Sequence, residues 1–471
     1  MAPWRRSDER TPDTVTGVTG VTRQDPVSGL SAWRLWLTPG MGVKRHVSLA
    51  VVGALLLVFG VIAGMLWAFN ERRFELSDPI EVALVSDSWE RYGGWVSFAL
   101  IAFGLVIAIL AVARLNRSLL SNIMERPQEM AQILHRRVML GRGPRIVILG
   151  GGTGTSNLLR GLREHTSNLT AVVAVSDDGG SSGRLRKAFG MPAPGDLTDC
   201  LAALSEHESS LSRLLQYRFV RGEELSGHTF GNLFITTLTE VEGDFGQALR
   251  ALNQLLNLSG AVYPATSQPV TLEVTKLSGE VVSGESRVRE VAGAVRSVTL
   301  TPAAPDSLPE VRESIMAADL VVLGPGSLFT STIPPLLVSD IADAVASSRA
   351  KLVYVANIMT EAGETDGFDA YDHVAALEAH GARTPDVVLL NSEPVDDRRV
   401  ARYLLESATV VAHAEERFAA AGITVVRQPL MSSGETAQHD SVLLANALAR
   451  LAREARSQGV AALPAQPAVA S

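Results

Sequence analysis

Residues 145–154, with the sequence RIVILGGGTG, decide the fold, together with the segment TSNLLRGL that continues to residue 162. A short apolar run ends in a glycine-rich turn, and leucines at helical spacing begin directly after it. A strand, a glycine turn and a helix in this order are typical of the first unit of a parallel α/β sheet, where amides at the helix N-terminus face a ligand above the strand. The motif therefore predicts an anion-binding loop at residues 151–154.

This loop departs from the dinucleotide-binding fingerprint. A third glycine is missing three places after Gly152, where Thr155 stands. The pattern favours a general phosphate or nucleotide loop over an NAD loop. A tight turn with a purely structural role is the alternative, and the strand–loop–helix context favours ligand binding over it.

The same alternation of elements continues toward the C-terminus. Short β-rich apolar runs separated by helical segments predict an α/β fold with a doubly wound, Rossmann-like, mainly parallel sheet. Residues 262–301 differ, because their meander of short strands predicts a small antiparallel insertion. Right-handed crossovers bring the carboxyl ends of the parallel strands to one edge, where such sheets bind ligands. The predicted parallel strands are residues 145–149, 171–175, 320–323, 352–356, 387–390 and 424–426, and those of the insertion are 270–275, 281–282 and 295–300.

A pair of carboxylates follows the second predicted strand. Asp177 and Asp178 begin the segment DDGGSSG at its tip. Two carboxylates in this position can orient a ribose, hold a divalent cation through oxygen, or act as a general base. The sequence leaves these roles open, and a hydrated Asp/Gly/Ser turn is the structural alternative.

Other polar clusters also follow strand ends or open helices. Residues 323–332, LGPGSLFTST, could form a second anion cradle, but they lack the lysine of a Walker loop. Residues 357–365, NIMTEAGET, put amide, hydroxyl and carboxylate groups at the same edge. His228 and Asn232 lie four residues apart and could share a helical face. A lone histidine is more often a capping or core residue than an acid or base.

These clusters supply the candidate site residues. The candidates for catalysis are Asp177, Asp178 and His228, and the first two are also the candidates for metal binding. The candidates for nucleotide binding are Gly151, Gly152, Thr153, Gly154, Asp196, Asn232, Gly324, Gly326, Ser327, Asn357 and Thr360. A nucleophile elbow, a zinc-protease helix and a kinase signature are all absent from the sequence, which disfavours hydrolase and metalloprotease functions.

Two long apolar segments precede this domain. Residues 47–69 and 95–113 carry no charged side chain and are each long enough to cross a bilayer as a helix. The loop 70–94 between them has six acidic and three basic residues, whereas Lys and Arg flank the outer ends of the segments. This distribution predicts an anchor in the cytoplasmic membrane, with both termini and the main domain in the cytoplasm. A signal peptide is the rival, but about 45 residues precede the first segment, too many for that interpretation.

The remaining segments and the overall composition complete the predicted organisation. We expect a disordered arm at 1–46, a helical linker at 114–142, one α/β domain at 143–457 and a disordered tail at 458–471. The linker holds six arginines against two glutamates, so it is either a solvated helix or a contact to anionic lipid head groups. The single cysteine, Cys200, excludes an intrachain disulfide. The net charge of −8 and its dispersed basic residues do not predict a nucleic-acid partner.

Six motifs in order resemble the gluconeogenesis factor family, within the CofD-like group that includes 2-phospho-L-lactate transferases. The matching stretches are residues 151–154, 177–184, 194–196, 227–233, 324–328 and 357–365. The resemblance implies a CofD-like fold that is often dimeric, binding of a UDP-sugar such as UDP-N-acetylglucosamine, and a regulatory role in cell shape and cell-wall homeostasis on gluconeogenic carbon sources. It also implies that the glycine loops line the diphosphate, while Asp177, Asp178 and Asn357 hold ribose, base or metal.

Three functions remain open from the sequence. A regulatory UDP-sugar sensor needs no cofactor. A nucleotide-dependent transferase of the 2-phospho-L-lactate transferase type would use a divalent metal, with Mg²⁺ as the candidate cofactor. An oxidoreductase is disfavoured by the missing third glycine.

Overall fold

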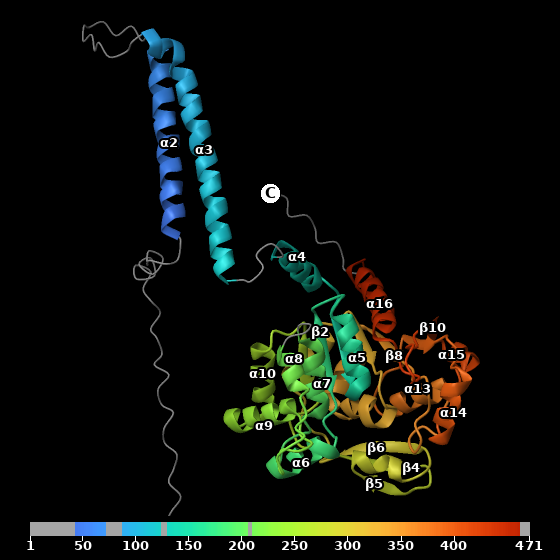
Figure 1. Ribbon diagram of the computed structural model, residues 1–471. Coiled ribbons are helices and arrows are strands. Elements are labelled where there is room, and N and C mark those ends of the chain that lie inside the picture. The colour runs from blue at the N-terminus through green and yellow to red at the C-terminus, as the bar shows by residue number, and fades with distance from the viewer. Residues whose placement is uncertain (1–42, 72–86, 124–129, 206–209, 462–471) are drawn as a thin grey trace, which may run out of the picture. The chain divides into compact units, whose positions relative to one another are not determined.

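The computed structural model describes residues 43–71, 87–123, 130–205 and 210–461 (Figure 1). The chain divides into two compact units, one up to Ile133 and the other from Leu134 onward. Most of the predicted arm, the middle of the predicted loop 70–94 and most of the predicted tail lie outside the described residues.

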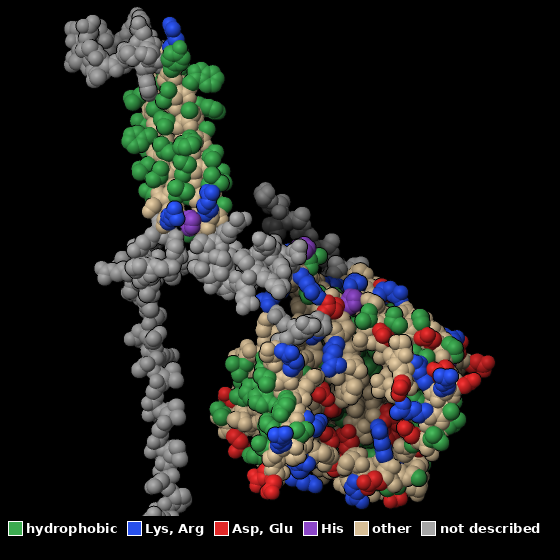
Figure 2. All heavy atoms as spheres, viewed as in Figure 1, with side chains coloured by type: hydrophobic (Ala, Val, Ile, Leu, Met, Phe, Trp, Pro, Cys, Tyr) green, Lys and Arg blue, Asp and Glu red, His purple; other side chains and the backbone are tan. Residues whose placement is uncertain are grey.

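The first unit contains two long helices that pack against each other, α2 (Val43–Glu71) and α3 (Asp87–Ile123). Glycine permits the close contact between the two helices. A Cβ on Gly53 would lie 2.9 Å from the carbonyl oxygen of Gly104, and a Cβ on Gly104 would lie 2.9 Å from the carbonyl oxygen of Gly53. Apolar side chains cover the outside of the helices (Figure 2), and that of Phe59 is 63% exposed. Both helices are long and apolar enough to cross a membrane, over Arg45–Ala68 and Arg91–Leu115.

The helices extend beyond the predicted spans. The helix α3 starts at Asp87, inside the predicted loop 70–94, and continues to Ile123, inside the predicted linker 114–142. The helix α4 (Met130–Gly141) forms the rest of the described linker. The final helix, α16 (Ser441–Ala461), ends four residues after the predicted domain boundary at residue 457.

The second unit is built on a seven-stranded parallel sheet with the order β10-β9-β8-β7-β1-β2-β3. Every residue of β1 and β9 is buried, as expected when helices cover both faces of a parallel sheet. The α/β prediction is confirmed. The strands are β1 (Ile146–Gly150), β2 (Leu169–Val173), β3 (Ala261–Pro264), β7 (Leu320–Leu323), β8 (Lys351–Val355), β9 (Val387–Asn391) and β10 (Thr424–Gln428).

The strand order reverses between β1 and β7. From β1 the chain moves outward through β2 and β3, and it then returns to β7 on the other side of β1 before moving outward through β8, β9 and β10. The chain therefore leaves β1 and β7 toward opposite ends of the sheet. A crevice at the carboxyl ends of these strands is where an open α/β sheet binds ligands.

One strand of the sheet was not predicted. Residues 262–264 fell within the predicted antiparallel insertion, but residues 261–264 form β3 and pair in parallel with β2. The strand has four residues and ends at Pro264, and a proline removes a ladder donor, so the segment gives a weak strand signal.

The insertion itself is confirmed as a small antiparallel sheet with the order β5-β4-β6. It consists of β4 (Thr271–Lys276), β5 (Val281–Ser283) and β6 (Val295–Thr301), with a short 3₁₀ helix, η2 (Glu285–Glu290), between β5 and β6. The fully buried Lys276 fastens this sheet to the main domain, because its Nζ donates to the carbonyl oxygens of Val288 and Gly363.

Helices fill the connections of the main sheet. The helix α5 follows β1 and packs against both α7 and α16. The helices are α5 (Gly152–Leu162), α6 (Gly180–Phe189), α7 (Gly195–Leu204), α8 (Ser210–Leu215), α9 (Phe230–Glu242), α10 (Phe245–Leu255), α11 (Pro309–Met316), α12 (Ser339–Ser347), α13 (Ala370–Ala379), α14 (Asp397–Leu405) and α15 (Glu415–Ala421), with the short turns η3 (Leu328–Thr332) and η4 (Pro334–Leu337).

Candidate functional site

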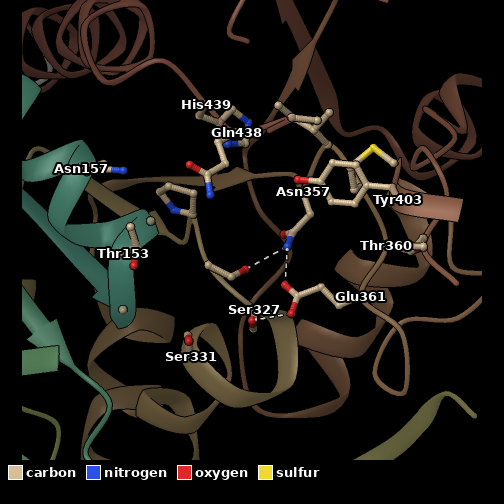
Figure 3. Close-up of a pocket in the computed structure, with 18 of the residues that line it drawn as sticks. Thr153, Asn157, Ser327, Ser331, Asn357, Thr360, Glu361, Tyr403, Gln438 and His439 are labelled. Atoms are coloured by element: carbon tan, nitrogen blue, oxygen red, sulfur yellow. Dashed lines mark hydrogen bonds between the residues drawn. The ribbon is translucent and has the colours of Figure 1, made fainter. Parts of the chain in front are cut away.

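A pocket of about 680 Å³ opens at the reversal of strand order (Figure 3). It is bounded by the glycine loop after β1, the glycine loop after β7, the segment after β8 and the start of α16. Eight of the predicted nucleotide-binding residues line it, namely Gly151, Gly152, Thr153, Gly154, Gly326, Ser327, Asn357 and Thr360.

The two glycine loops touch each other at the base of the pocket. A Cβ on Gly154 would lie 2.7 Å from the carbonyl oxygen of Pro325, so a residue with a side chain would force the loops apart. The hydroxyl of Thr155, the residue that replaces the third fingerprint glycine, donates to the same oxygen at 3.3 Å. The first turn of α5, whose amides have no partner within the helix, therefore opens directly into the pocket.

The carboxylate of Glu361 lies against the second glycine loop. The Ser327 hydroxyl donates to Glu361 Oε2 at 2.6 Å, and the Asn357 amide lies 3.4 Å from Glu361 Oε1 and 3.0 Å from the Gly326 carbonyl oxygen. Figure 3 shows these three side chains turned toward one another at the pocket wall. Donors that an anionic ligand would use are thus engaged by an acidic side chain of the protein itself.

The insertion contributes an arginine to the same wall. Arg289, from η2, forms an ion pair with Glu361 and donates to Ser327 Oγ at 3.2 Å. Its Nε also donates to Glu364 Oε1 at 3.2 Å. The pKa of Glu364 is raised to about 7, first by burial and then by the neighbouring Glu361, while Arg289 opposes the rise. Since the second oxygen of Glu364 is buried without a partner, this carboxyl is a pH-sensitive element behind the pocket wall.

The opposite wall comes from the C-terminal part of the chain. Tyr403, Gln438 and His439 line the pocket there, and none of them was a sequence candidate. Burial lowers the pKa of His439 to about 4, and its Nε2 is shielded from solvent without a hydrogen-bond partner. The ring is therefore neutral at physiological pH.

Asp196 lies immediately behind the first glycine loop rather than in the pocket lining. It accepts a hydrogen bond from the backbone amide of Gly152. The pKa of Asp196 is raised to about 7, first by burial and then by the carboxylates of Asp177 and Asp199. Burial also raises the pKa of Glu285, with Asp196 and Asp177 as the next causes, although Ser176 Oγ donates to Glu285 Oε2 at 3.1 Å. These carboxyls form one electrostatically coupled group beside the loop.

The two predicted metal ligands differ in their surroundings. Asp177 accepts from the amide of Gly179 at 2.9 Å and belongs to the coupled group with Asp196. Asp178 instead accepts from the amide of Ser286 at 2.9 Å, so it fastens the insertion to the strand tip. Among the described residues, no three acidic, histidine or cysteine side chains gather at metal-binding distances. Mg²⁺ is commonly held by one or two carboxylates plus ligand phosphates, so the magnesium assignment stays a prediction.

The predicted residues His228, Asn232 and Gly324 do not line the pocket. His228 Nδ1 lies 2.8 Å from Ser181 Oγ, Arg184 donates to His228 Nε2 at 3.2 Å, and Asn232 donates to Ser181 Oγ at 3.0 Å. Burial lowers the pKa of His228, followed by the charge of Arg184. His228 and Asn232 do not share a helical face, because α9 begins at Phe230 with Thr229 as its N-cap and His228 precedes it. Both side chains instead contact Ser181 Oγ, which holds α6 against α9. The catalytic role of His228 stays a prediction without a pocket contact.

Replacing Asp196 by asparagine should change how stability depends on pH. A carboxyl whose folded-state pKa is raised stabilises the fold fully below the unfolded-state pKa and loses that contribution as pH rises through about 7. We expect Asp196→Asn to raise the free energy of unfolding at pH 8 by at most about 4 kcal/mol, with little change near pH 4. Urea denaturation of residues 130–461 across this pH range measures the difference. The exposed Asp343→Asn is the control, and an equal pH dependence in wild type and Asp196→Asn would contradict the assigned burial.

Comparisons with known proteins agree with this architecture. The family model of the 2-phospho-L-lactate transferase CofD matches residues 146–431. A Deinococcus radiodurans protein named "Putative gluconeogenesis factor" is 44% identical over 439 residues, which cover 89% of each chain. The Bacillus subtilis gluconeogenesis factor is 43% identical over 317 residues, 67% of this chain and 100% of that protein.

A solved structure gives the same result. The crystal structure of a Bacillus halodurans protein superposes with a TM-score of 0.63 and 40% identity, and it covers 65% of this chain and 99% of its own. The shared fold, the family model and the near-complete coverage of these relatives confirm the resemblance seen in the motifs. The chain belongs to the CofD-like family, among the members that are called gluconeogenesis factors.

Proposed function

We propose that the second unit binds a UDP-sugar such as UDP-N-acetylglucosamine and acts as a regulatory protein in cell-shape and cell-wall homeostasis on gluconeogenic carbon sources. The observation that carries the proposal is the pocket between two touching glycine loops at the reversal of strand order. Its volume of about 680 Å³ lies within the range of sites that enclose small organic ligands.

The side chains that line the pocket suit a diphosphate that joins a nucleoside to a sugar. The amides at the start of α5, apart from that of Gly152, which donates to Asp196, are donors for phosphate oxygens, as is the Ser327 hydroxyl. Asn357, Thr360 and Gln438 supply amide and hydroxyl groups for ribose or sugar hydroxyls, and the ring of Tyr403 offers a surface for a base or sugar. Arg289 supplies the positive charge that a diphosphate needs.

The regulatory role is supported by the groups at the wall. His439 is neutral, and Glu361 is held by an ion pair and hydrogen bonds. Neither side chain is therefore placed to act together with another pocket residue as general acid and base. The names of the relatives support a role in gluconeogenic growth. A homodimer, which the family resemblance implies, belongs to the same proposal.

A transferase of the 2-phospho-L-lactate type is the second candidate. The buried carboxyls Asp196 and Glu285 and the adjacent Asp177 favour it, because they lie beside the loop that would receive the diphosphate. Asp177 and Asp196 would hold Mg²⁺ together with ligand phosphates, and the metal would supply charge neutralisation for the phosphoryl oxygens.

We also propose that α2 and α3 anchor the domain to the cytoplasmic membrane, with both termini in the cytoplasm. Their length, apolar surface and small-residue contact are the supporting features. The short loop between them carries more acidic than basic residues, which favours the external side.

Changing the charge of Glu361 should strengthen ligand binding. Because Glu361 engages the donors of the second glycine loop, Glu361→Gln should increase the affinity for UDP-N-acetylglucosamine by about tenfold, and Arg289→Gln should weaken it by a similar factor. Calorimetric titration of residues 130–461, with and without Mg²⁺, measures both. Arg402→Gln, on α14, is the matched control for loss of one positive charge.

The outcomes of this titration separate the two functions. Saturable binding with the sugar nucleotide recovered unchanged supports the sensor. Mg²⁺-dependent product formation supports the transferase. Absence of binding to UDP-sugars in every variant contradicts the proposed ligand.

Deleting the helical hairpin should release the protein from membranes. We expect a chain that starts at residue 141 to fractionate as a soluble protein, because it lacks both apolar helices. A chain that starts at residue 43 keeps both helices and should stay with the membrane fraction. Sedimentation of the shorter chain with membranes would show that the hairpin is not the sole anchor.

A further inference from the structure

A basic face lies at the edge of the domain opposite the pocket. It consists of Arg136, Arg137 and Arg142 of α4 and the following turn, together with Arg453 and Arg456 near the end of α16. These five side chains are exposed, and blue side chains gather where α4 and α16 approach each other in Figure 2. The face is at the amino-terminal edge of the sheet, because β1 begins only a few residues after α4.

Direct contacts hold the basic face together. Arg456 donates to the carbonyl oxygens of Arg142 and Gly143 at 2.7 and 2.6 Å, which joins α16 to the end of α4. Arg453 lies 3.4 Å from His165 Nδ1, and Arg136 forms an ion pair with Glu164, so the turn after α5 lies between the two helices. The surface is therefore a fixed arrangement of side chains from three segments.

The charge of this face contrasts with that of the whole chain. Five arginines are accompanied by Glu164 and Glu454, which leaves a local charge of 5 − 2 = +3 in a chain whose net charge is −8. The hydrogen bonds of Arg456 to the carbonyl oxygens of Arg142 and Gly143 involve neutral groups, so they do not cancel its positive charge. Such a concentration of guanidinium groups attracts anionic surfaces.

Apolar side chains lie beside the charges. Val138 and Met139, which follow Arg137 on α4, are 45% and 54% exposed. A helix that presents arginines next to exposed apolar side chains is typical of the bilayer interface, where the charges meet head groups and the apolar groups enter the acyl boundary. The charged backbone of a nucleic acid would offer these apolar side chains no contact partner.

We infer that the basic face binds the anionic phospholipid head groups of the membrane that holds the hairpin. The inference rests on the proposed anchor, because only residues 124–129 separate α3 from α4, and such a segment spans at most about 25 Å. The basic face, which begins on α4, is therefore within reach of the head groups of that bilayer. With the basic face on the lipid, the pocket at the opposite edge of the sheet opens away from the membrane.

The test uses residues 130–471, which lack the hairpin. The Bacillus halodurans crystal structure, of which 99% matches 65% of this chain, shows that a protein of this size folds without such helices. We expect the fragment to sediment with vesicles that contain phosphatidylglycerol and not with vesicles of phosphatidylcholine alone. The double variant Arg142→Gln/Arg453→Gln should lose about 25-fold in vesicle affinity, since each basic residue at an anionic surface accounts for about fivefold.

The control removes the same charge elsewhere. Arg398→Gln/Arg402→Gln, on α14, should leave vesicle binding unchanged. Equal loss in both double variants, equal binding to neutral vesicles, or no vesicle binding would overturn the inference. Preference for a DNA duplex over anionic vesicles would overturn it in favour of nucleic acid. If the full chain is found in the membrane but the fragment does not bind vesicles, the inferred lipid contact is wrong, whereas the proposed anchor is retained.

Discussion

The close approach of two glycine loops at the reversal of strand order is the constraint on which the site depends. A side chain at Gly154 would meet the carbonyl oxygen of Pro325, so the helix α5 can start next to the second loop only because glycine stands there. This contact places the first turn of α5 and the hydroxyl of Ser327 at one pocket. The parallel sheet fixes the loops from below, because β1 and β7 are hydrogen-bonded neighbours.

The insertion completes the pocket and couples it to buried charges. Lys276 holds the Gly363 carbonyl, while Arg289 reaches Glu361 and Glu364, so the loop after β8 is fixed from the side of the small sheet. An anionic ligand that draws Arg289 away from Glu361 would also remove a positive charge from beside the buried Glu364. If the pocket binds the proposed ligand, its binding and the protonation of Glu364 would be linked through Arg289.

The local part of this architecture was readable from the sequence. Six of the seven strands of the main sheet, both glycine loops and Asn357 follow from short patterns, because a glycine turn at a strand end has a mechanism that needs no distant partner. Residues contributed by distant segments were not readable: Arg289 belongs to an insertion, and Tyr403 and His439 carry no motif. Asp178 and His228 stand in strong motifs, yet their contacts hold the insertion and α6 in place, which only the tertiary arrangement reveals.

Hydrogen exchange on the second unit, with and without UDP-N-acetylglucosamine, tests the central claim most directly. Amides in the first turn of a helix have no intrahelical partner and exchange readily when free. The account predicts that the ligand slows exchange at residues 151–154 and 326–328 and leaves residues 228–232 unchanged. Slowed exchange confined to the region of His228, with the glycine loops unaffected, would contradict a ligand site at the β1–β7 junction.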